Sequence, residues 1–309
     1  MKFAFVFPGQ GSQSVGMMAA YGDAPILRAT FDEASAALGQ DLWQLAAEGP
    51  AEAQAQTVNT QPLMLTAGVA VYRLWQERGG PEPAAVAGHS LGEYAALVAA
   101  GVVELRDAVP LVRLRAQAMQ EAVPAGEGAM AAILGLDEAG VKAACADAAM
   151  GEVVEAVNFN GPGQTVIAGH AAAVNRAAEA CKARGAKRAV LLAVSAPFHC
   201  ALMRPAGEKL KARLESIPFS PPRLPVIHNF DLKPRSDPQS IKDAMVQQSF
   251  SPVRWTETVE AFAAMGITHV YECGPGKVLA GLTRRIVGSL QGAALVDGAS
   301  LDKALAEVK

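Results

Sequence analysis

The segment GHSLG at residues 88–92 constrains this chain more than any other feature, because it fits a serine on a sharp strand-to-helix turn. The apolar residues 84–87 before it predict a short buried strand, and the alanine-rich residues 94–100 after it predict a helix. A glycine-flanked serine also occurs by chance in turns, but this predicted context favours Ser90 as a nucleophile. The backbone N–H of Leu91 would then face a developing oxyanion at the helix N-terminus.

Strands and helices alternate along much of the chain. The apolar run at residues 3–7 ends at Pro8 and predicts a buried strand, whereas helices are expected at residues 26–38, 62–77 and 107–122. Such alternation is typical of a mainly parallel sheet with helices on both faces. We therefore expect an α/β fold for the larger part of the chain.

Residues 126–195 follow a pattern of their own. It predicts two helices, at residues 137–149 and 171–184, and four strands, at residues 129–135, 153–159, 165–168 and 187–194. Their order, β-α-β-β-α-β, is that of the ferredoxin-like split unit. We expect a small α+β domain at residues 126–195, inserted into a large domain formed by residues 1–125 and 196–309.

The composition excludes several classes of protein. The 309 residues include 27 Lys and Arg against 30 Asp and Glu, and the net charge of −3 excludes a strongly basic nucleic-acid coat. No apolar run approaches the roughly 18 residues of a membrane-spanning helix, and the N-terminal run is too short for a signal peptide. The four cysteines are far apart with no CxxC pair, which indicates neither a disulfide framework nor a metal site. We expect a cytoplasmic protein that binds neither metal, membrane nor nucleic acid.

Five histidines are candidates for the base that would activate Ser90. His89 adjoins it on the turn and is expected to point elsewhere, as a structural or pocket-lining residue. His199 follows a proline-containing break where the small domain returns to the large one, and such loops commonly carry catalytic side chains. The other three are expected as a surface cap at a helix start or in strand-like segments: His170, His228 and His269. The residues alone single out His199 without deciding the choice.

Several segments together resemble one family. In chain order they are GQGSQ at residues 9–13, GHSLGEY at 88–94, Arg115 with Met119, residues 158–163, Phe198-His199 and ECGPGK at 272–277. Over essentially the whole chain they are similar to the malonyl-CoA:acyl-carrier-protein transacylase family of type II fatty acid synthesis, related to the acyltransferase domains of fatty-acid and polyketide synthases. The resemblance implies a hydrolase-like large domain that bears a ferredoxin-like small one.

The resemblance also implies an activity. It is that of a ping-pong acyltransferase, which moves malonyl from coenzyme A to the phosphopantetheine thiol of acyl carrier protein through an ester of Ser90. His199 would be the general base toward Ser90 and the acid toward the departing thiolate, with Gln248 orienting it by hydrogen bonding. The backbone N–H groups of Gln10 and Leu91 resemble the family's oxyanion hole. No cofactor is implied, since coenzyme A enters in malonyl-CoA and leaves as a product.

Arg115 resembles the residue that binds the malonyl carboxylate. A planar guanidinium holds a carboxylate through two parallel hydrogen bonds, and that carboxylate distinguishes malonyl from acetyl. The residues alone fit a solvated arginine on a helix as well. The resemblance implies three more substrate-binding residues: Met119, Phe198 and His89. The Phe198 ring would exclude an α-methyl branch, although some bacterial relatives carry serine there.

An acidic carrier protein would need a local basic patch on a chain whose net charge is −3. The resemblance points to five residues for it: Lys187, Arg188, Lys277, Arg284 and Arg285. Adjacent basic residues are equally common on solvated faces that bind nothing. No feature of the sequence indicates an obligate oligomer, and we expect a monomer.

Two alternatives remain at this point. An α/β-hydrolase esterase places its histidine late in the chain, which would recruit His228 or His269 instead of His199. A catalytically silent scaffold would need none of Ser90, His199 and Arg115, so their joint presence favours an enzyme. The histidine that approaches Ser90 in the folded chain decides between the two enzymes.

Overall fold

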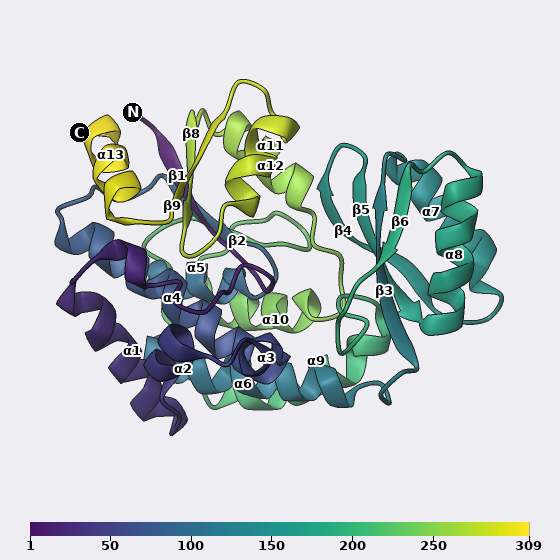
Figure 1. Ribbon diagram of the computed structural model, residues 1–309, viewed down its shortest axis with the longest axis horizontal. Helices are drawn as coiled ribbons and strands as arrows, with labels where there is room; N and C mark the ends of the chain where they lie inside the picture. Colours follow the sequence, from purple (N-terminus) through teal and green to yellow (C-terminus); the bar gives the residue numbers. More distant parts are fainter. Residues whose placement is uncertain (309) are drawn as a thin grey trace.

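The computed structural model describes residues 1–308, which form two separate sheets (Figure 1). Sheet A is parallel throughout, in the order β7-β2-β1-β8-β9. Its strands are β1 (Phe3–Phe7), β2 (Ala85–Gly88), β7 (Val226–Ile227), β8 (His269–Cys273) and β9 (Gln291–Leu295). Sheet B is antiparallel, in the order β4-β5-β3-β6, with strands β3 (Gly128–Leu134), β4 (Val154–Gly161), β5 (Gln164–His170) and β6 (Arg188–Leu191).

Helices cover both faces of sheet A, because its central strand is apolar on both sides. Phe5 of β1 packs in the core with Trp75, their ring centroids 5.0 Å apart, whereas the alternate residues Ala4 and Val6 face the cluster around Trp255. The helices around sheet A are α1 (Pro25–Leu38), α2 (Leu42–Glu48), α3 (Ala51–Ala55), α4 (Thr57–Glu77), α5 (Gly92–Ala99), α6 (Leu105–Glu121), α9 (Arg204–Glu215), α10 (Pro238–Gln248), α11 (Trp255–Ala264), α12 (Val278–Ile286) and α13 (Gly298–Val308).

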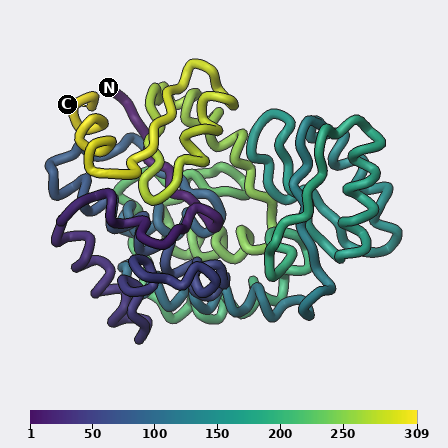
Figure 2. The backbone as a smooth tube through the Cα atoms, viewed as in Figure 1, coloured from purple at the N-terminus to yellow at the C-terminus, as the bar shows by residue number. Residues whose placement is uncertain are grey.

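Sheet B carries its two helices on one face only. Helices α7 (Glu138–Ala149) and α8 (Ala171–Ala183) pack on that face, and the other face, with Met130 and Val157, packs against the segment around Cys200. Figure 2 traces the chain out of α6 into this unit and back toward α9. The predicted fold class, an α/β unit around sheet A with a second, α+β unit around sheet B, is therefore confirmed. The boundaries at residues 126 and 195 stay a prediction.

Backbone hydrogen bonds join β4 of sheet B to the segment before α11, which packs against sheet A. The Phe159 N–H donates to the Val253 carbonyl at 2.9 Å, and the Val253 N–H donates to the Val157 carbonyl at 2.8 Å. The Thr256 hydroxyl donates to the Phe159 carbonyl at 3.0 Å. This seam fixes the position of Asn158, between the two bonded residues of β4, relative to sheet A.

Two local predictions were wrong, and a third was only partly right. The helix expected from residue 62 begins at Thr57, because a proline one turn into a helix forfeits only one backbone hydrogen bond and α4 is buried along most of its length. The last strand of sheet B ends at Leu191 instead of residue 194, since the chain turns away there to line a cavity. His170 is the N-cap residue of α8 as expected, but its side chain does not cap the helix; its Nδ1 accepts a hydrogen bond from the Val153 N–H at 2.9 Å.

The structure describes the state of the cysteines and the character of the helices, which bear on cross-links and on membrane-spanning segments. All four cysteines are buried free thiols. No helix within residues 1–308 combines the length and the apolar character needed to cross a bilayer.

Two glycines let the turn after β2 pack against its neighbours. A Cβ on Gly92 would lie 2.1 Å from the Phe7 carbonyl oxygen, and a Cβ on Gly88 would lie 1.9 Å from the Gly92 backbone. Both contacts are with backbone atoms, which cannot rotate away. The first turn of α5 therefore packs directly on β1 only because both positions lack a side chain.

Gly92→Ala is expected to lower the free energy of unfolding by about 3 kcal/mol, because the added methyl group forces α5 off β1. Gly281→Ala is the matched control, since a Cβ there meets open space on α12. It should raise stability by up to about 1 kcal/mol through helix propensity. Urea unfolding followed by circular dichroism compares the two, and equal stabilities would contradict the packing argument.

Candidate active site

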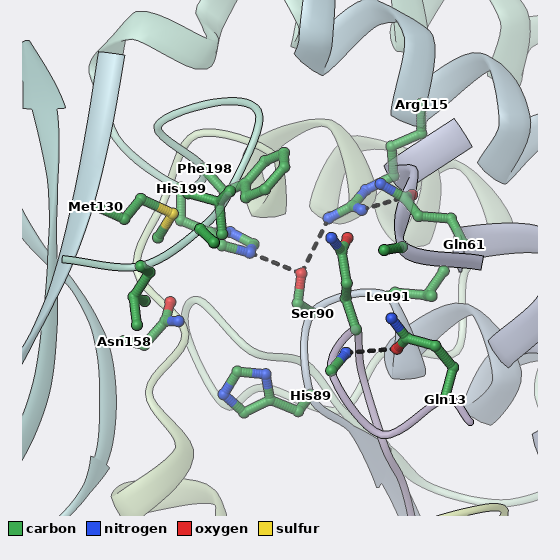
Figure 3. Close-up of a pocket in the computed structure, with 16 residues that line it drawn as sticks. Gln13, Gln61, His89, Ser90, Leu91, Arg115, Met130, Asn158, Phe198 and His199 are labelled. Carbon is green, nitrogen blue, oxygen red and sulfur yellow. Dashed lines mark hydrogen bonds between the residues drawn. The ribbon is translucent and has the colours of Figure 1, made fainter. Parts of the chain in front are cut away.

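A cavity of about 290 Å³ lies between the two sheets, and Ser90 lines it (Figure 3). Residues 10–13 and 89–91 of the sheet A unit form one side, and Arg115 reaches it from α6. The other side comes from sheet B and the segment after it, through Met130, Asn158 and residues 192–194. The cavity thus lies at the carboxyl end of β2, where parallel α/β sheets commonly bind ligands.

Ser90 occupies a strained turn directly after β2. Its backbone φ of 52° lies in the left-handed region, which is uncommon for a residue other than glycine and concentrated at functional sites. Asn229 holds both sides of the turn, because its Oδ1 accepts from the Ser90 N–H at 2.8 Å and its Nδ2 donates to the Gly88 carbonyl at 2.7 Å. Gln10 and Leu91 also line the cavity, and their backbone N–H groups have no acceptor among residues 1–308.

His199 is the histidine that approaches the serine. Its Nε2 lies 2.7 Å from Ser90 Oγ, and its Nδ1 lies 3.1 Å from the backbone carbonyl of Gln248. A carbonyl can only accept, so Nδ1 carries the proton and Nε2 presents its lone pair to the hydroxyl. Burial, reinforced by the charge of Arg115, lowers the pKa of His199 to about 3. The ring is therefore neutral at physiological pH and can take the serine proton.

Arg115 is buried beside the hydroxyl, with 2% of its surface exposed, so the solvated-helix alternative is wrong. Its Nη2 donates to Ser90 Oγ at 3.2 Å and to Gln248 Oε1 at 3.0 Å, and its Nη1 donates to Gln61 Oε1 at 2.9 Å. Burial lowers the pKa of Arg115, and the ring of Tyr94 lies 5.4 Å from the guanidinium carbon. Within residues 1–308 no carboxylate hydrogen-bonds to this cation, which suits it to an anionic ligand.

The other histidines bond elsewhere. His89 lines the cavity, but its Nε2 lies 2.8 Å from Asn160 Oδ1 and its ring points away from the serine hydroxyl (Figure 3). His228 Nδ1 is 2.6 Å from a buried carboxylate oxygen of Glu93. His269 opens β8, at the opposite end of the parallel sheet from the turn that follows β2. The arrangement expected for an esterase, with His228 or His269 on the serine, is therefore absent from the described chain.

Phe198 and Met119, two of the remaining candidate residues, lie at different positions relative to the cavity. Phe198 lines the cavity directly. Met119 is fully buried in the cluster against which Phe198 packs, and it is not among the lining residues. Met119 therefore lies behind the cavity wall, in the cluster that supports Phe198.

The five candidate docking residues are all exposed but do not form one compact patch. Lys187 and Arg188 lie at the start of β6, and Arg284 and Arg285 lie in the last turn of α12. Arg285 Nη1 is 3.4 Å from Gln164 Oε1, and Gln164 and Arg188 both pair with Leu134, so these basic residues share one end of sheet B. Lys277 precedes the opposite end of α12.

Sequence reasoning missed three polar residues around the turn: Glu93, Asn229 and Gln61. Glu93 gave a signal that was overlooked, because it is a lone carboxylate in the otherwise apolar helix α5. Asn229 gave none, since it follows a two-residue strand in a loop and contacts Ser90 across 139 residues of sequence.

Known proteins resemble this chain over its whole length. The acyl transferase domain model matches residues 4–296. The malonyl CoA-acyl carrier protein transacylase of Salmonella typhimurium is 58% identical over 99% of both chains. The acyl-carrier-protein S-malonyltransferase structure from Burkholderia pseudomallei is 60% identical, covering 99% of this chain and 100% of that one, with a TM-score of 0.98.

A second solved relative has been determined together with a partner protein. It is a malonyl-transacylase in complex with a type II polyketide acyl-carrier protein, 53% identical, covering 99% of this chain and 100% of that one, with a TM-score of 0.98. The family match spans both sheets and the cavity between them. The chain therefore belongs to the acyl transferase domain family and is an acyltransferase.

Proposed function

We propose that this enzyme transfers the malonyl group of malonyl-CoA to the phosphopantetheine thiol of acyl carrier protein through an ester of Ser90. One observation carries the proposal: a buried cation lies beside a paired nucleophile, with Arg115 Nη2 3.2 Å and His199 Nε2 2.7 Å from the same hydroxyl. An acyl group that carries its own carboxylate suits such a site. The names of the relatives point to the same substrate and partner.

Acylation begins when Ser90 Oγ attacks the thioester carbonyl and its proton passes to His199 Nε2. The carbonyl oxygen becomes an oxyanion, which the N–H groups of Gln10 and Leu91 stabilise. The carbon–sulfur bond then breaks, and coenzyme A leaves with the proton returned by His199. A thiol has a pKa of about 8.5, so this leaving group needs little protonation. This low demand for protonation is consistent with a Ser–His pair in which His199 Nδ1 bonds to the Gln248 carbonyl instead of to the carboxylate of an Asp or Glu.

Deacylation is the same chemistry in reverse. The phosphopantetheine thiol gives its proton to His199, and its sulfur attacks the Ser90 ester. The ester bond breaks, and the serine oxygen regains the proton from His199. Coenzyme A leaves before the carrier protein binds, and the acyl group stays on Ser90 in between, so the kinetics are ping-pong. Neither half-reaction requires a cofactor.

Selectivity for malonyl would rest on Arg115 and Phe198. The guanidinium can exchange its contact with Ser90 for hydrogen bonds to the malonyl carboxylate, which acetyl lacks, while Gln248 continues to hold it. The Phe198 ring in the cavity wall would disfavour an α-methyl branch.

The carrier protein is the partner that the proposal requires. Support comes from the solved relative in complex with an acyl-carrier protein. The basic end of sheet B, formed by Lys187, Arg188 and Arg285, would attract an acidic partner. We propose fatty acid biosynthesis as the pathway that consumes the product, and a monomer as the working form.

Ser90→Ala should abolish the covalent adduct that the wild-type protein forms with labelled malonyl-CoA, because no other hydroxyl is paired with His199. Intact-mass spectrometry of the protein after brief incubation measures the adduct. An adduct of unchanged yield in the variant would contradict the mechanism.

Arg115→Ala should reduce malonyl transfer by about tenfold or more beyond any reduction of acetyl transfer, since hydrogen bonds to a charged group contribute about 1.5–3 kcal/mol each. The measurement is kcat/KM for both acyl-CoA substrates. Arg113→Ala is the matched control, because Arg113 lies on the same helix but bonds to Gln40 and Asn59. Equal losses with both substrates in the Arg115 variant would refute the carboxylate role.

The rate of acyl-enzyme formation should stay constant as the pH falls from 8 through the ordinary histidine pKa of about 6.5. The pKa of His199 is lowered to about 3, so the neutral base persists across this range and is lost only at much lower pH. Rapid-quench measurement of the adduct gives the profile. A half-loss of rate near pH 6.5 would contradict the neutral state assigned to the ring.

A further inference from the structure

A buried carboxylate lies behind the Ser90 turn without lining the cavity. Glu93, in the first turn of α5, has no exposed surface. Its Oε1 lies 2.6 Å from His228 Nδ1, and its Oε2 accepts from the Asn229 N–H and from Gln248 Nε2, both at 3.1 Å. Three donors thus converge on one carboxylate, two of them from residues that contact Ser90.

One branch of these contacts runs through Gln248. Its Nε2 donates to Glu93 Oε2 at 3.1 Å and to the Ser90 carbonyl at 2.7 Å, which leaves Oε1 to accept from Arg115 at 3.0 Å. If the amide were rotated by half a turn, its NH₂ group would face the guanidinium, donor against donor. Glu93 therefore helps to determine which end of the amide faces Arg115.

The other branch runs through Asn229. Its N–H donates to Glu93, while its side chain bonds the Ser90 N–H and the Gly88 carbonyl. This branch bears on the serine alone and so affects every acyl substrate alike.

We propose that Glu93 is a positioning residue that orients the Gln248 amide and, through it, the Arg115 guanidinium for the malonyl carboxylate. The inference rests on the proposed function and deepens it by naming a residue on which acyl selectivity depends. The charge of Glu93 also favours the protonated form of Arg115 and so opposes the effect of burial on its pKa.

Glutamine cannot reproduce all the contacts of Glu93, although it has nearly the same shape. A carboxylate accepts on both oxygens, whereas an amide replaces one of them with a donor. If that donor faced Asn229 and Gln248, it would oppose two other donors. If it faced His228 Nδ1, the ring proton would have to move to Nε2, which has no partner among residues 1–308. Either orientation leaves buried polar groups unmatched.

The test compares Glu93→Gln with Glu272→Gln. Glu272 is an equally buried carboxylate in the same α/β unit, where it accepts from the Ala280 N–H at 2.9 Å and does not line the cavity. The readout is kcat/KM for malonyl-CoA divided by that for acetyl-CoA. Glu93→Gln should lower this ratio by about tenfold, because one hydrogen bond to the charged Arg115 becomes misaligned. Glu272→Gln should leave the ratio unchanged. A purely structural role for Glu93 would lower both rates and keep their ratio.

A ratio within about twofold of wild type in folded Glu93→Gln would overturn the inference, as would an equal drop in Glu272→Gln. If Glu93→Gln does not fold, Glu93→Asp is measured by the same standard, because its side chain is one methylene shorter and withdraws the acceptor oxygen from Gln248 Nε2. A wild-type enzyme that forms no malonyl adduct would refute the proposed function instead. The crystal structure of the variant then decides the inference by itself, through loss or retention of the 3.0 Å contact between Gln248 Oε1 and Arg115.

Discussion

The residue on which the rest of the site depends is Gln248, because its backbone and its side chain hold different groups. It is the last residue of α10, where helix carbonyls no longer have partners within the helix. That carbonyl accepts the His199 Nδ1 proton, while the side-chain amide bonds Arg115 and the Ser90 carbonyl. The partial negative charge of a helix C-terminus favours a cation nearby, typically by about 0.3–1 kcal/mol. In the proposed reaction it would stabilise the imidazolium that forms when His199 takes the serine proton.

Burial has different effects on the charge of the two basic side chains of the site, His199 and Arg115. The His199 ring is neutral because charging it without water is costly and Arg115 is close. Arg115 remains a cation, since a guanidinium is very hard to deprotonate even where burial lowers its pKa. The same buried environment therefore provides a neutral base next to a fixed positive charge.

The parts of the fold encoded by local patterns were predictable from the sequence. The strand, turn and helix around Ser90 follow from a short apolar run, two glycines and an alanine-rich stretch, and the order of elements in sheet B follows from similar local signals. Contacts between distant segments were not. Glu93 meets His228 across 135 residues, and no local pattern records such a pairing. Met119 shows a related limit, because its helical position carries no signal of whether it faces the cavity or the core behind it.

One of the four free cysteines has a consequence for the proposed transfer of an acyl group to a thiol. Cys200 directly follows His199, so a second nucleophilic group stands next to the proposed base in the sequence. Burial raises the pKa of Cys200 to about 12, and its Sγ lies 3.1 Å from the Pro197 carbonyl. Only the thiolate is an effective nucleophile, so this sulfur stays protonated and unreactive at physiological pH. In the proposed reaction, burial thus keeps Cys200 from competing with the thiol of the incoming substrate.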